Sequence, residues 1–270
     1  MTPATVHVPI GRVDGRITRR QEDVLAIEEP LEIRVGSRSL SVTMRTPGHD
    51  FDLAAGFLFS EGIINSAEQI HGMRQLQPNI VTVELAPNVV SIAARPQRAF
   101  VVTSACGLCG KASLESLAEN RCPVVATKGL KIDSDVIHQL PHNLRQRQDI
   151  FESTGGLHAA ALFNSQGELE WLREDVGRHN AVDKLVGHAL LNSRTPLKGS
   201  VMLVSGRASF ELVQKASVAG IPMMAAVGAP SSLAVATAAR CEMTLIGFLR
   251  NGRFNVYNGT GCIAGLETLQ

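Results

Sequence analysis

Two cysteines three residues apart form the part of the sequence best suited to chemistry. Cys106 and Cys109 lie in the stretch SACGLCGK at 104–111, which follows an expected strand and precedes an expected helix. Backbone N–H groups at the start of that helix and the ammonium of Lys111 favour a thiolate. A thiolate attacks a persulfide, a disulfide or a metal ion. Three interpretations of the pair therefore stay open: half of a structural metal site, a dithiol–disulfide redox pair, or a sulfur relay.

The other three cysteines give little support to a metal site. A structural zinc ion needs four ligands in tetrahedral geometry, and the chain has one close cysteine pair. Cys122, Cys241 and Cys262 stand singly in apolar or glycine-rich surroundings, where we expect inert packing. Five cysteines without a secretory signal segment also argue against a disulfide framework. We therefore expect that the protein ligates no metal.

Two common motifs are absent in their standard form. Zinc deaminases carry H-x-E upstream of P-C-x-x-C, whereas the segment 158–160 here lacks the glutamate and follows the cysteines. Gly110 and Lys111 resemble the end of a P-loop. However, Ala105 stands in place of the first glycine and Ala112 in place of the Ser/Thr. Phosphate-binding groups must therefore come from elsewhere in the chain.

Arginines follow the ends of several expected parallel strands. Ligands of parallel sheets bind beyond the carboxyl ends of the strands, and guanidinium groups are forked phosphate donors. Those ends carry Arg207, the segment 228–232 and the segment 248–253. Arg178 and His179 open an expected helix and would be further donors if that helix start binds a ligand. The alternative is a helix turn with capping acids and surface ion pairs.

Hydrophobic periodicity divides the chain into three parts. Residues 1–28 are expected to form a loosely ordered segment. Residues 29–97 are expected to form a small α+β domain, with a hairpin over 31–44, a helix starting near Asp50, and strands at 80–85 and 89–94. Residues 98–270 are expected to form a larger α/β domain that carries the cysteine pair.

The larger domain has the clearer alternation of elements. Its expected strands lie at 98–103, 157–163, 168–172, 201–205, 223–227 and 243–248. Its expected helices lie at 113–120, from Ser134 to a break at Pro141, and at 182–190, 209–219 and 233–240. The βαβαβ order of its last part predicts parallel strands with right-handed crossovers.

Composition and charge exclude several classes of protein. With 44% hydrophobic and 19% charged residues, the chain can bury a core. A net charge of +1 gives no overall field that would attract nucleic acid or an anionic membrane. Residues 216–239 carry no charge, but Gly220 and Pro222 would break a spanning helix. We expect a cytoplasmic protein that binds no nucleic acid and does not insert into a membrane.

Six sequence blocks, taken together, resemble the formate dehydrogenase accessory sulfurtransferase family (FdhD/NarQ). They are MRTPGHDFDLAAGFLFSEGII (44–64), TSACGLCGKAS (103–113), STGGLHAAAL (153–162), EDVGRHNAVDKLVG (174–187), VSGRASFELVQKA (204–216) and IPMMAAVGAPSSLAV (221–235). The blocks follow one another in order over most of the chain, which is far more specific than one C-x-x-C pair.

The resemblance implies a fold and an activity. The fold is a cytidine-deaminase-like three-layer α/β core with a mixed, partly parallel sheet, which has lost the deaminase site. The activity is sulfur transfer: a cysteine desulfurase supplies sulfur, Cys106 carries it as a persulfide with Cys109 assisting, and the molybdenum cofactor of formate dehydrogenase receives it. A rival interpretation is a chaperone that holds the cofactor or the apo-dehydrogenase, with structural or redox cysteines.

The resemblance also implies a cofactor site and an assembly. The acceptor is bis-molybdopterin guanine dinucleotide, bound through its guanine nucleotide portion, and the protein is expected to be a homodimer. The family's cofactor stretch falls on Phe248, Leu249, Arg250, Asn251, Gly252 and Arg253. Arg207, Arg178 and His179 are the further candidate donors for this polyanion.

Overall fold

The structure is a computed structural model of the chain, and it describes residues 3–87, 89, 100–102, 122–127 and 129–266. Cys106 and Cys109 lie outside the described residues. So do the expected helix at 113–120 and almost all of the expected strand at 89–94.

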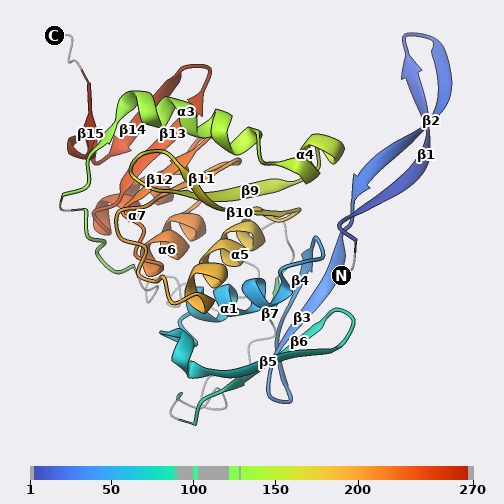
Figure 1. Cartoon of the computed structure of the whole chain (residues 1–270), viewed down its shortest axis with the longest axis horizontal. Coiled ribbons are helices and arrows are strands. Elements are labelled where there is room, and N and C mark those ends of the chain that lie inside the picture. The colour runs from blue at the N-terminus through green and yellow to red at the C-terminus, as the bar shows by residue number, and fades with distance from the viewer. Residues whose placement is uncertain (1–2, 88, 90–99, 103–121, 128, 267–270) are drawn as a thin grey trace.

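A six-stranded mixed sheet forms the centre of the molecule (Figure 1). Its strands, in spatial order, are β10 (Leu169–Asp175), β9 (His158–Phe163), β11 (Val201–Val204), β12 (Met223–Ala226), β13 (Thr244–Arg250) and β14 (Arg253–Asn258). The strands β11, β12 and β13 run parallel, connected by α6 (Phe210–Val218) and α7 (Ser232–Arg240). The predicted βαβαβ unit is confirmed.

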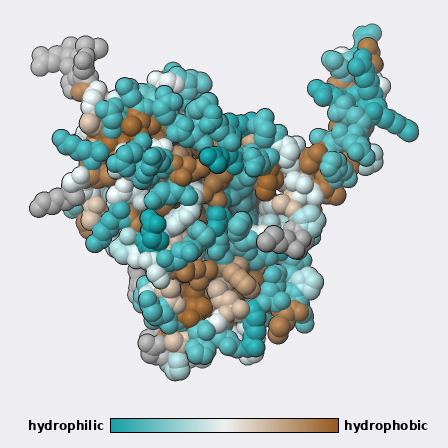
Figure 2. All heavy atoms as spheres, viewed as in Figure 1, coloured by the Kyte–Doolittle hydropathy of each residue, from teal (hydrophilic) through white to brown (hydrophobic). Residues whose placement is uncertain are grey.

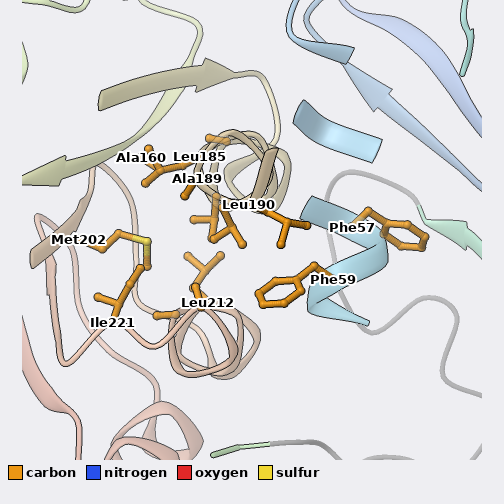
Figure 3. Packing of buried hydrophobic residues seen from close by; sticks show 14 of the residues in the cluster. Phe57, Phe59, Ala160, Leu185, Ala189, Leu190, Met202, Leu212 and Ile221 are labelled. Carbon is orange, nitrogen blue, oxygen red and sulfur yellow. The ribbon is translucent and has the colours of Figure 1, made fainter. Parts of the chain in front are cut away.

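Helices cover both faces of this sheet. Along β9, Ala159 and Ala161 pack toward α3 (Ser134–Arg145), while Ala160 and Leu162 pack toward α5 (Arg178–Leu191) and α6. The period-2 alternation of strand side chains produces this division into two apolar clusters. Figure 3 shows the cluster on the α5 and α6 side. The expected three-layer α/β core with a mixed sheet is confirmed.

The helix α3 corrects one expectation, because it continues through Pro141 instead of breaking there. Its residues Ile137, Leu140 and Leu144 are all buried against the sheet. Burial of this apolar face on both sides of the proline offsets the hydrogen bond that proline cannot donate. A short helix, α4 (Asp149–Thr154), follows and ends at Gly155.

A second sheet comes from the N-terminal part of the chain. Its strands, in spatial order, are β5 (Ile70–Gln77), β6 (Ile80–Leu85), β3 (Glu29–Val35), β4 (Arg38–Arg45) and β7 (Phe100–Val102). A short 3-10 turn, η1 (Ala67–Gln69), precedes β5. The predicted hairpin β3–β4 and the predicted strand at 80–85 are confirmed, whereas β5 was not expected.

Helix α1 (Asp50–Ser60) joins the two sheets by packing against α5. The two helices touch through glycines: a Cβ on Gly187 would lie 1.8 Å from the backbone oxygen of Asp52, and one on Gly56 would lie 1.9 Å from that of Asp183. In Figure 3, Phe57 and Phe59 of α1 lie on the Leu190 side of α5. One apolar cluster therefore runs from the second sheet to the central one. The expected domain boundary at 97/98 falls outside the described residues and stays a prediction.

Residues 5–26 correct the expectation of a loosely ordered start. The strands β1 (Thr5–Asp14) and β2 (Ile17–Ala26) pair along their whole length, from Thr5 opposite Ala26 to Asp14 opposite Ile17. Gly15, with φ +61°, supplies the left-handed conformation of the tight turn. The ribbon projects from the body and is mostly hydrophilic on the surface shown (Figures 1 and 2).

A disulfide between Cys122 and Cys241 corrects the expectation that both are inert packing residues. Their Cα atoms are 5.9 Å apart although 119 residues separate them in sequence, so no local pattern could reveal the pair. The N–H of Val125 also donates to the carbonyl of Cys241, at 3.0 Å. The segment that begins at Cys122 is therefore held against the end of α7.

A small two-stranded sheet lies near the C-terminus, and it completes the described elements. It pairs β8 (Ile132–Asp133) with β15 (Ile263–Ala264), which follows the turn η3 (Thr260–Cys262). Among the described helices, none is long and apolar enough to cross a membrane.

Candidate functional site

The ends of β11, β12 and β13 meet at one edge of the central sheet. The N–H of Gly228 donates to the carbonyl of Gly206 at 3.0 Å, and the N–H of Phe248 donates to the carbonyl of Gly228 at 3.0 Å. A Cβ on Gly228 would lie 2.9 Å from the Gly206 oxygen and 3.1 Å from Arg207 Cα, so glycine is required for this approach. The structure thus brings Arg207 and the segments 228–231 and 248–253 to the same edge.

A cavity of about 520 Å³ opens at this edge on the α3 side, and we call it the edge cavity. This volume suits a nucleotide-sized ligand. Its lining comes from α3, α4, the start of β9 and the ends of β11 and β12: Pro141, Leu144, Arg145, Gln148, Phe151, Gly155, Gly156, Leu157, His158, Ser205 and Val227.

Gln148 brings a buried side-chain amide to the edge cavity. Its side chain is buried, at 5% exposed, and its Nε2 makes no hydrogen bond within the described structure. The amide is still near enough to Glu174 to favour that carboxylate's ionised form. Beside it, the guanidinium of Arg145 lies 4.3 Å from the centre of the Phe151 ring. A buried unpaired amide beside a flat surface suits a planar heterocycle that carries a hydrogen-bond acceptor.

His158 is a titratable residue in the lining of the edge cavity. Its ring lies within 3.4 Å of the position of a Cβ on Gly206. Burial lowers the pKa of His158, and the charge of Arg178 lowers it further. The imidazole is therefore neutral at pH 7 and offers one donor and one acceptor. The guanidinium of Arg178 is close enough to influence this ring, and its Nε is buried without a hydrogen bond in the described structure.

The predicted stretch 248–253 forms a hairpin tip. Phe248, Leu249 and Arg250 end β13, Asn251 and Gly252 make the turn, and Arg253 begins β14. Leu249 is buried, whereas Arg250 and Arg253 are exposed. They stand opposite each other across the two strands. Like charges opposite each other destabilise a hairpin, and an anion bound between them would remove that penalty.

A second, smaller pocket of about 50 Å³ lies between the second sheet, α1, α5 and α6, and we call it the junction pocket. Its lining residues are Ile33, Ser41, Thr43, Leu53, Phe57, Ser60, Glu61, His179, Asn180, Asp183, Glu211, Gln214 and Lys215. The structure therefore places His179 in the junction pocket. Binding of the cofactor by His179 and by the arginines stays a prediction.

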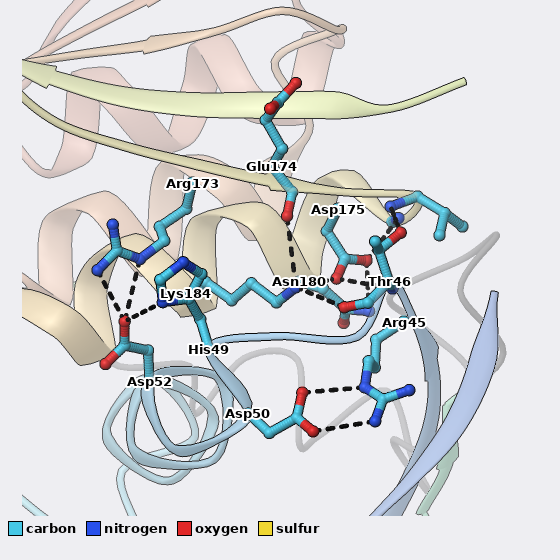
Figure 4. A network of polar contacts seen from close by, with 12 residues as sticks. Arg45, Thr46, His49, Asp50, Asp52, Arg173, Glu174, Asp175, Asn180 and Lys184 are labelled. Atoms are coloured by element: carbon cyan, nitrogen blue, oxygen red, sulfur yellow. Dashed lines mark hydrogen bonds and ion pairs between the residues drawn. The ribbon is translucent and has the colours of Figure 1, made fainter. Parts of the chain in front are cut away.

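A buried polar network fixes one wall of the junction pocket (Figure 4). The ammonium of Lys184 lies 2.7 Å from Asp175 and donates to the carbonyl of Thr46 at 2.8 Å. Asn180 donates to Asp175 at 3.0 Å and accepts from Thr43 at 3.2 Å. Burial raises the pKa of Asp175, and the charge of Lys184 opposes that rise. The network ties the chain between β4 and α1 to the start of α5.

Strand β7 is the described element that precedes the cysteine pair in the sequence, and it pairs with a strand that lines the junction pocket. Val102, the last residue of β7, stands opposite Thr43 of β4, and Thr43 lines the pocket. Cys106 and Cys109 follow Val102 by four and seven positions in the sequence, outside the described residues.

Fold and sites together define a class of protein: a three-layer α/β chain with a nucleotide-sized cavity at its strand ends, a second pocket between its two sheets, and a C-x-x-C pair in its sequence. The sequence profile of the FdhD/NarQ family matches residues 26–264. The chain belongs to this family.

Relatives cover nearly the whole chain. Proteins named sulfur carrier protein FdhD are 51% identical in Streptomyces avermitilis, over 93% of this chain and 92% of that protein, and 43% identical in Saccharolobus solfataricus, over 91% and 93%. A crystal structure from Desulfotalea psychrophila, named as a formate dehydrogenase accessory protein, superposes with a TM-score of 0.79 at 26% identity. It covers 97% of this chain and 100% of its own.

Proposed function

We propose that this protein is a cytoplasmic sulfurtransferase for formate dehydrogenase that carries sulfur as a persulfide on Cys106. A cysteine desulfurase supplies the sulfur, Cys109 assists its release, and bis-molybdopterin guanine dinucleotide receives it on a homodimeric protein. Relatives that match more than nine tenths of the chain are named sulfur carrier proteins. The observation that carries the proposal is the match of the family profile to residues 26–264, a span that includes Cys106 and Cys109.

The guanine nucleotide portion of this acceptor fits the edge cavity. The apolar walls take the planar base, and Gln148 Nε2 donates to the carbonyl oxygen that guanine carries at C6. The phosphates then extend toward Arg207 and the hairpin tip with Arg250 and Arg253, where forked donors neutralise their charge. The overall charge of +1 does not conflict with such a ligand, because the donors are gathered at one edge.

Persulfide formation tests the function directly. After incubation with a cysteine desulfurase and cysteine, intact-protein and peptide mass spectra should show one added sulfur on Cys106. Cys106→Ala should stay folded, gain no sulfur there and fail to activate a formate dehydrogenase. Cys262→Ala is the matched control and should behave like the wild type, because Cys262 is the free cysteine of the described structure.

The rival interpretations predict different results in the mass spectra and in the activation assay. A loss of two hydrogens without added sulfur would indicate a redox pair. Full activation of the dehydrogenase by Cys106→Ala would indicate a chaperone with structural cysteines. Loss of activation in Cys109→Ala alone would exchange the roles of the two cysteines.

GDP serves as a probe for the edge cavity. Bound GDP should increase the free energy of unfolding of the wild type by RT ln(1 + [L]/Kd), which is about 2.7 kcal/mol at one hundred times Kd. The thermal midpoint should rise as a consequence. Gln148→Leu should lose most of this shift, because the donor to the base is removed. Arg250→Ala with Arg253→Ala should weaken it through the phosphates.

Two controls make this test specific. ADP, which lacks the carbonyl acceptor, should give a smaller shift that does not depend on Gln148. Gln166→Leu, at an exposed turn, should keep the full response to GDP. If Gln148→Leu and the double arginine variant both keep that response, the nucleotide binds elsewhere.

A further inference from the structure

The disulfide between Cys122 and Cys241 has one sheltered end and one accessible end. Cys241 is 0% exposed and belongs to the apolar core, where it follows the last residue of α7. Cys122 is only partly buried, and it lines a cavity of about 460 Å³. The two sulfur atoms of one bond therefore differ in their access to a reagent from solution.

The cavity beside Cys122, which we call the disulfide cavity, has an uncharged lining. The lining comes from the end of α1, the segment after it, the end of α6 and the start of the segment 122–127: Phe59, Ile64, Asn65, Cys122, Pro123 and Val218. None of these six residues carries a charged side chain, so the lining does not repel an approaching thiolate. The volume lies within the range of small-molecule sites. The cavity therefore gives a low-molecular-weight thiol a path to Cys122.

The segment 122–127 depends on the disulfide for its position. It forms neither helix nor strand, so no regular backbone hydrogen bonds hold it in place. The N–H of Val125 donates to the carbonyl of Cys241 at 3.0 Å, and the hydroxyl of Ser217 donates to the carbonyl of Pro123 at 2.6 Å. A bond between residues 119 positions apart restrains the chain far more than two hydrogen bonds do, because it removes the entropy of a long loop.

We propose that Cys122 is an exchange site for low-molecular-weight thiols, and that the Cys122–Cys241 disulfide is a reversible clamp whose reduction releases the segment 122–127 from α7. The inference goes beyond the proposed function, because neither cysteine takes part in the sulfur transfer described above. Disulfides of cytoplasmic proteins are mostly catalytic or redox-sensing, and access to a sulfur atom governs how fast it exchanges. The disulfide cavity supplies that access at Cys122 alone.

The exchange balances with the thiol as the reductant. A thiolate R–S⁻ attacks the sulfur of Cys122, the bond to Cys241 breaks, and the mixed disulfide Cys122–S–S–R forms. The Cys241 thiolate leaves and takes the proton that R–SH gave up. A second thiolate attacks the R sulfur of the mixed disulfide, forms R–S–S–R and releases Cys122, which is protonated in turn. The sum is Cys122–S–S–Cys241 + 2 R–SH → Cys122–SH + Cys241–SH + R–S–S–R, and the reverse reaction closes the clamp.

The position of the mixed disulfide tests the exchange site. Glutathione serves as the probe on the folded, full-length wild type, and N-ethylmaleimide then blocks the free thiols. Trypsin places the two cysteines in separate peptides, 122–128 and 241–250, for mass spectrometry. The glutathionyl group should lie on Cys122 roughly ten times more often than on Cys241, because access decides which sulfur is attacked. Equal occupancy of the two, or a disulfide that stays intact until the protein unfolds, would overturn the inference.

A change in the disulfide cavity tests the path of the thiol. Val218→Phe adds a larger side chain to the lining and should slow glutathionylation of Cys122 roughly fivefold or more, because the approach is narrowed. Leu233→Phe is the matched control, since Leu233 is an exposed residue of α7 outside the lining, and it should keep the wild-type rate. Equal rates in Val218→Phe and the wild type would refute the cavity as the path.

Amide hydrogen exchange measures the release of the segment. In the disulfide form, the N–H of Val125 is protected by its bond to the Cys241 carbonyl, and after reduction it should exchange roughly tenfold faster or more. Cys241→Ser cannot form the disulfide and should show the fast exchange without any reductant. Cys262→Ser, at the free cysteine of the described structure, should exchange like the wild type. Identical exchange of 122–127 in the two redox states would show that the hydrogen bonds alone hold the segment, and the clamp would be refuted.

Discussion

Alanine at position 187 is expected to prevent α1 from packing on α5 and to cost more than about 4 kcal/mol of unfolding free energy. The added Cβ would lie 1.8 Å from the backbone oxygen of Asp52 and 2.6 Å from the backbone N of Gly56. Both are main-chain atoms of a buried helix, so no side chain can move aside. In an isolated helix the same change would stabilise by about 1 kcal/mol, so the sign of the effect reports the helix contact.

Urea unfolding with circular dichroism measures this effect. Gly261→Ala is the matched control, because a Cβ there meets no heavy atom within 4 Å, and it should unfold like the wild type. Gly56→Ala should fail in the same way as Gly187→Ala, since its Cβ would lie 1.9 Å from the Asp183 oxygen. Wild-type stability of Gly187→Ala would mean that the helices pack differently from the arrangement described.

Replacing Lys184 with methionine is the second change with a large expected effect, about 3–5 kcal/mol. The side chain keeps its length, but Asp175, which is 0% exposed, loses the ammonium 2.7 Å away. The carbonyl of Thr46 loses a donor as well. A buried carboxylate without its cation is far less stable than either a complete pair or an uncharged substitute.

The deficit of Lys184→Met should depend on pH in a defined direction. Burial already raises the pKa of Asp175, and loss of the cation raises it further. A carboxyl group whose folded pKa lies above its unfolded value stabilises the fold below the unfolded pKa, and this contribution is lost as pH rises through the folded pKa. Urea midpoints of the variant should therefore fall from pH 5 to pH 8 relative to the wild type.

A second variant at the same pair and a variant at an exposed lysine provide the controls. Adding Asp175→Asn to Lys184→Met should recover part of the stability at pH 8 and remove the extra pH dependence. Lys198→Met, at an exposed lysine, should have no measurable effect. A pH-independent deficit in Lys184→Met would show that lost packing, and not the stranded charge, causes the instability.

The apolar framework of the fold is the part that could be predicted from sequence. Continuous apolar runs at 201–204 and 223–226 indicate strands buried on both faces, and both are β-strands of the central sheet. The alternating pattern at 80–85 likewise predicts a strand, and β6 has the same bounds in the structure. These signals work because burial imposes a fixed period on each type of element.

Features without an apolar face could not be predicted in this way. The ribbon β1–β2 buries little, so its residues show no periodic burial, although Gly15 marks the turn. The segment 142–150 is polar with mixed charge, a composition typical of a solvated face or hinge. The structure instead buries Gln148 in the edge cavity, because α4 folds back beside α3.

The buried network around Asp175 shows the same difficulty for charged residues. Asp175, Asn180 and Lys184 lie in the polar stretch that opens α5. For such a stretch, capping acids and surface ion pairs are the simplest interpretation. A weak signal was present, since the helix face that carries Lys184 also carries Ala181 and Gly187, three residues before and after it, which have no polar side chain. The disulfide partner of Cys122 had no such signal, because tertiary contact alone brings Cys241 close.

The ribbon has a consequence for how the chain tolerates change. The match to the family profile begins at residue 26, where β2 ends, and no residue from 5 to 26 belongs to the buried core. Substitutions there do not alter core packing, so the fold places few demands on their identity. The ribbon can therefore diverge between related proteins at little cost to folding, and its tip at Gly15 and Arg16 is a natural place to attach a probe or tag.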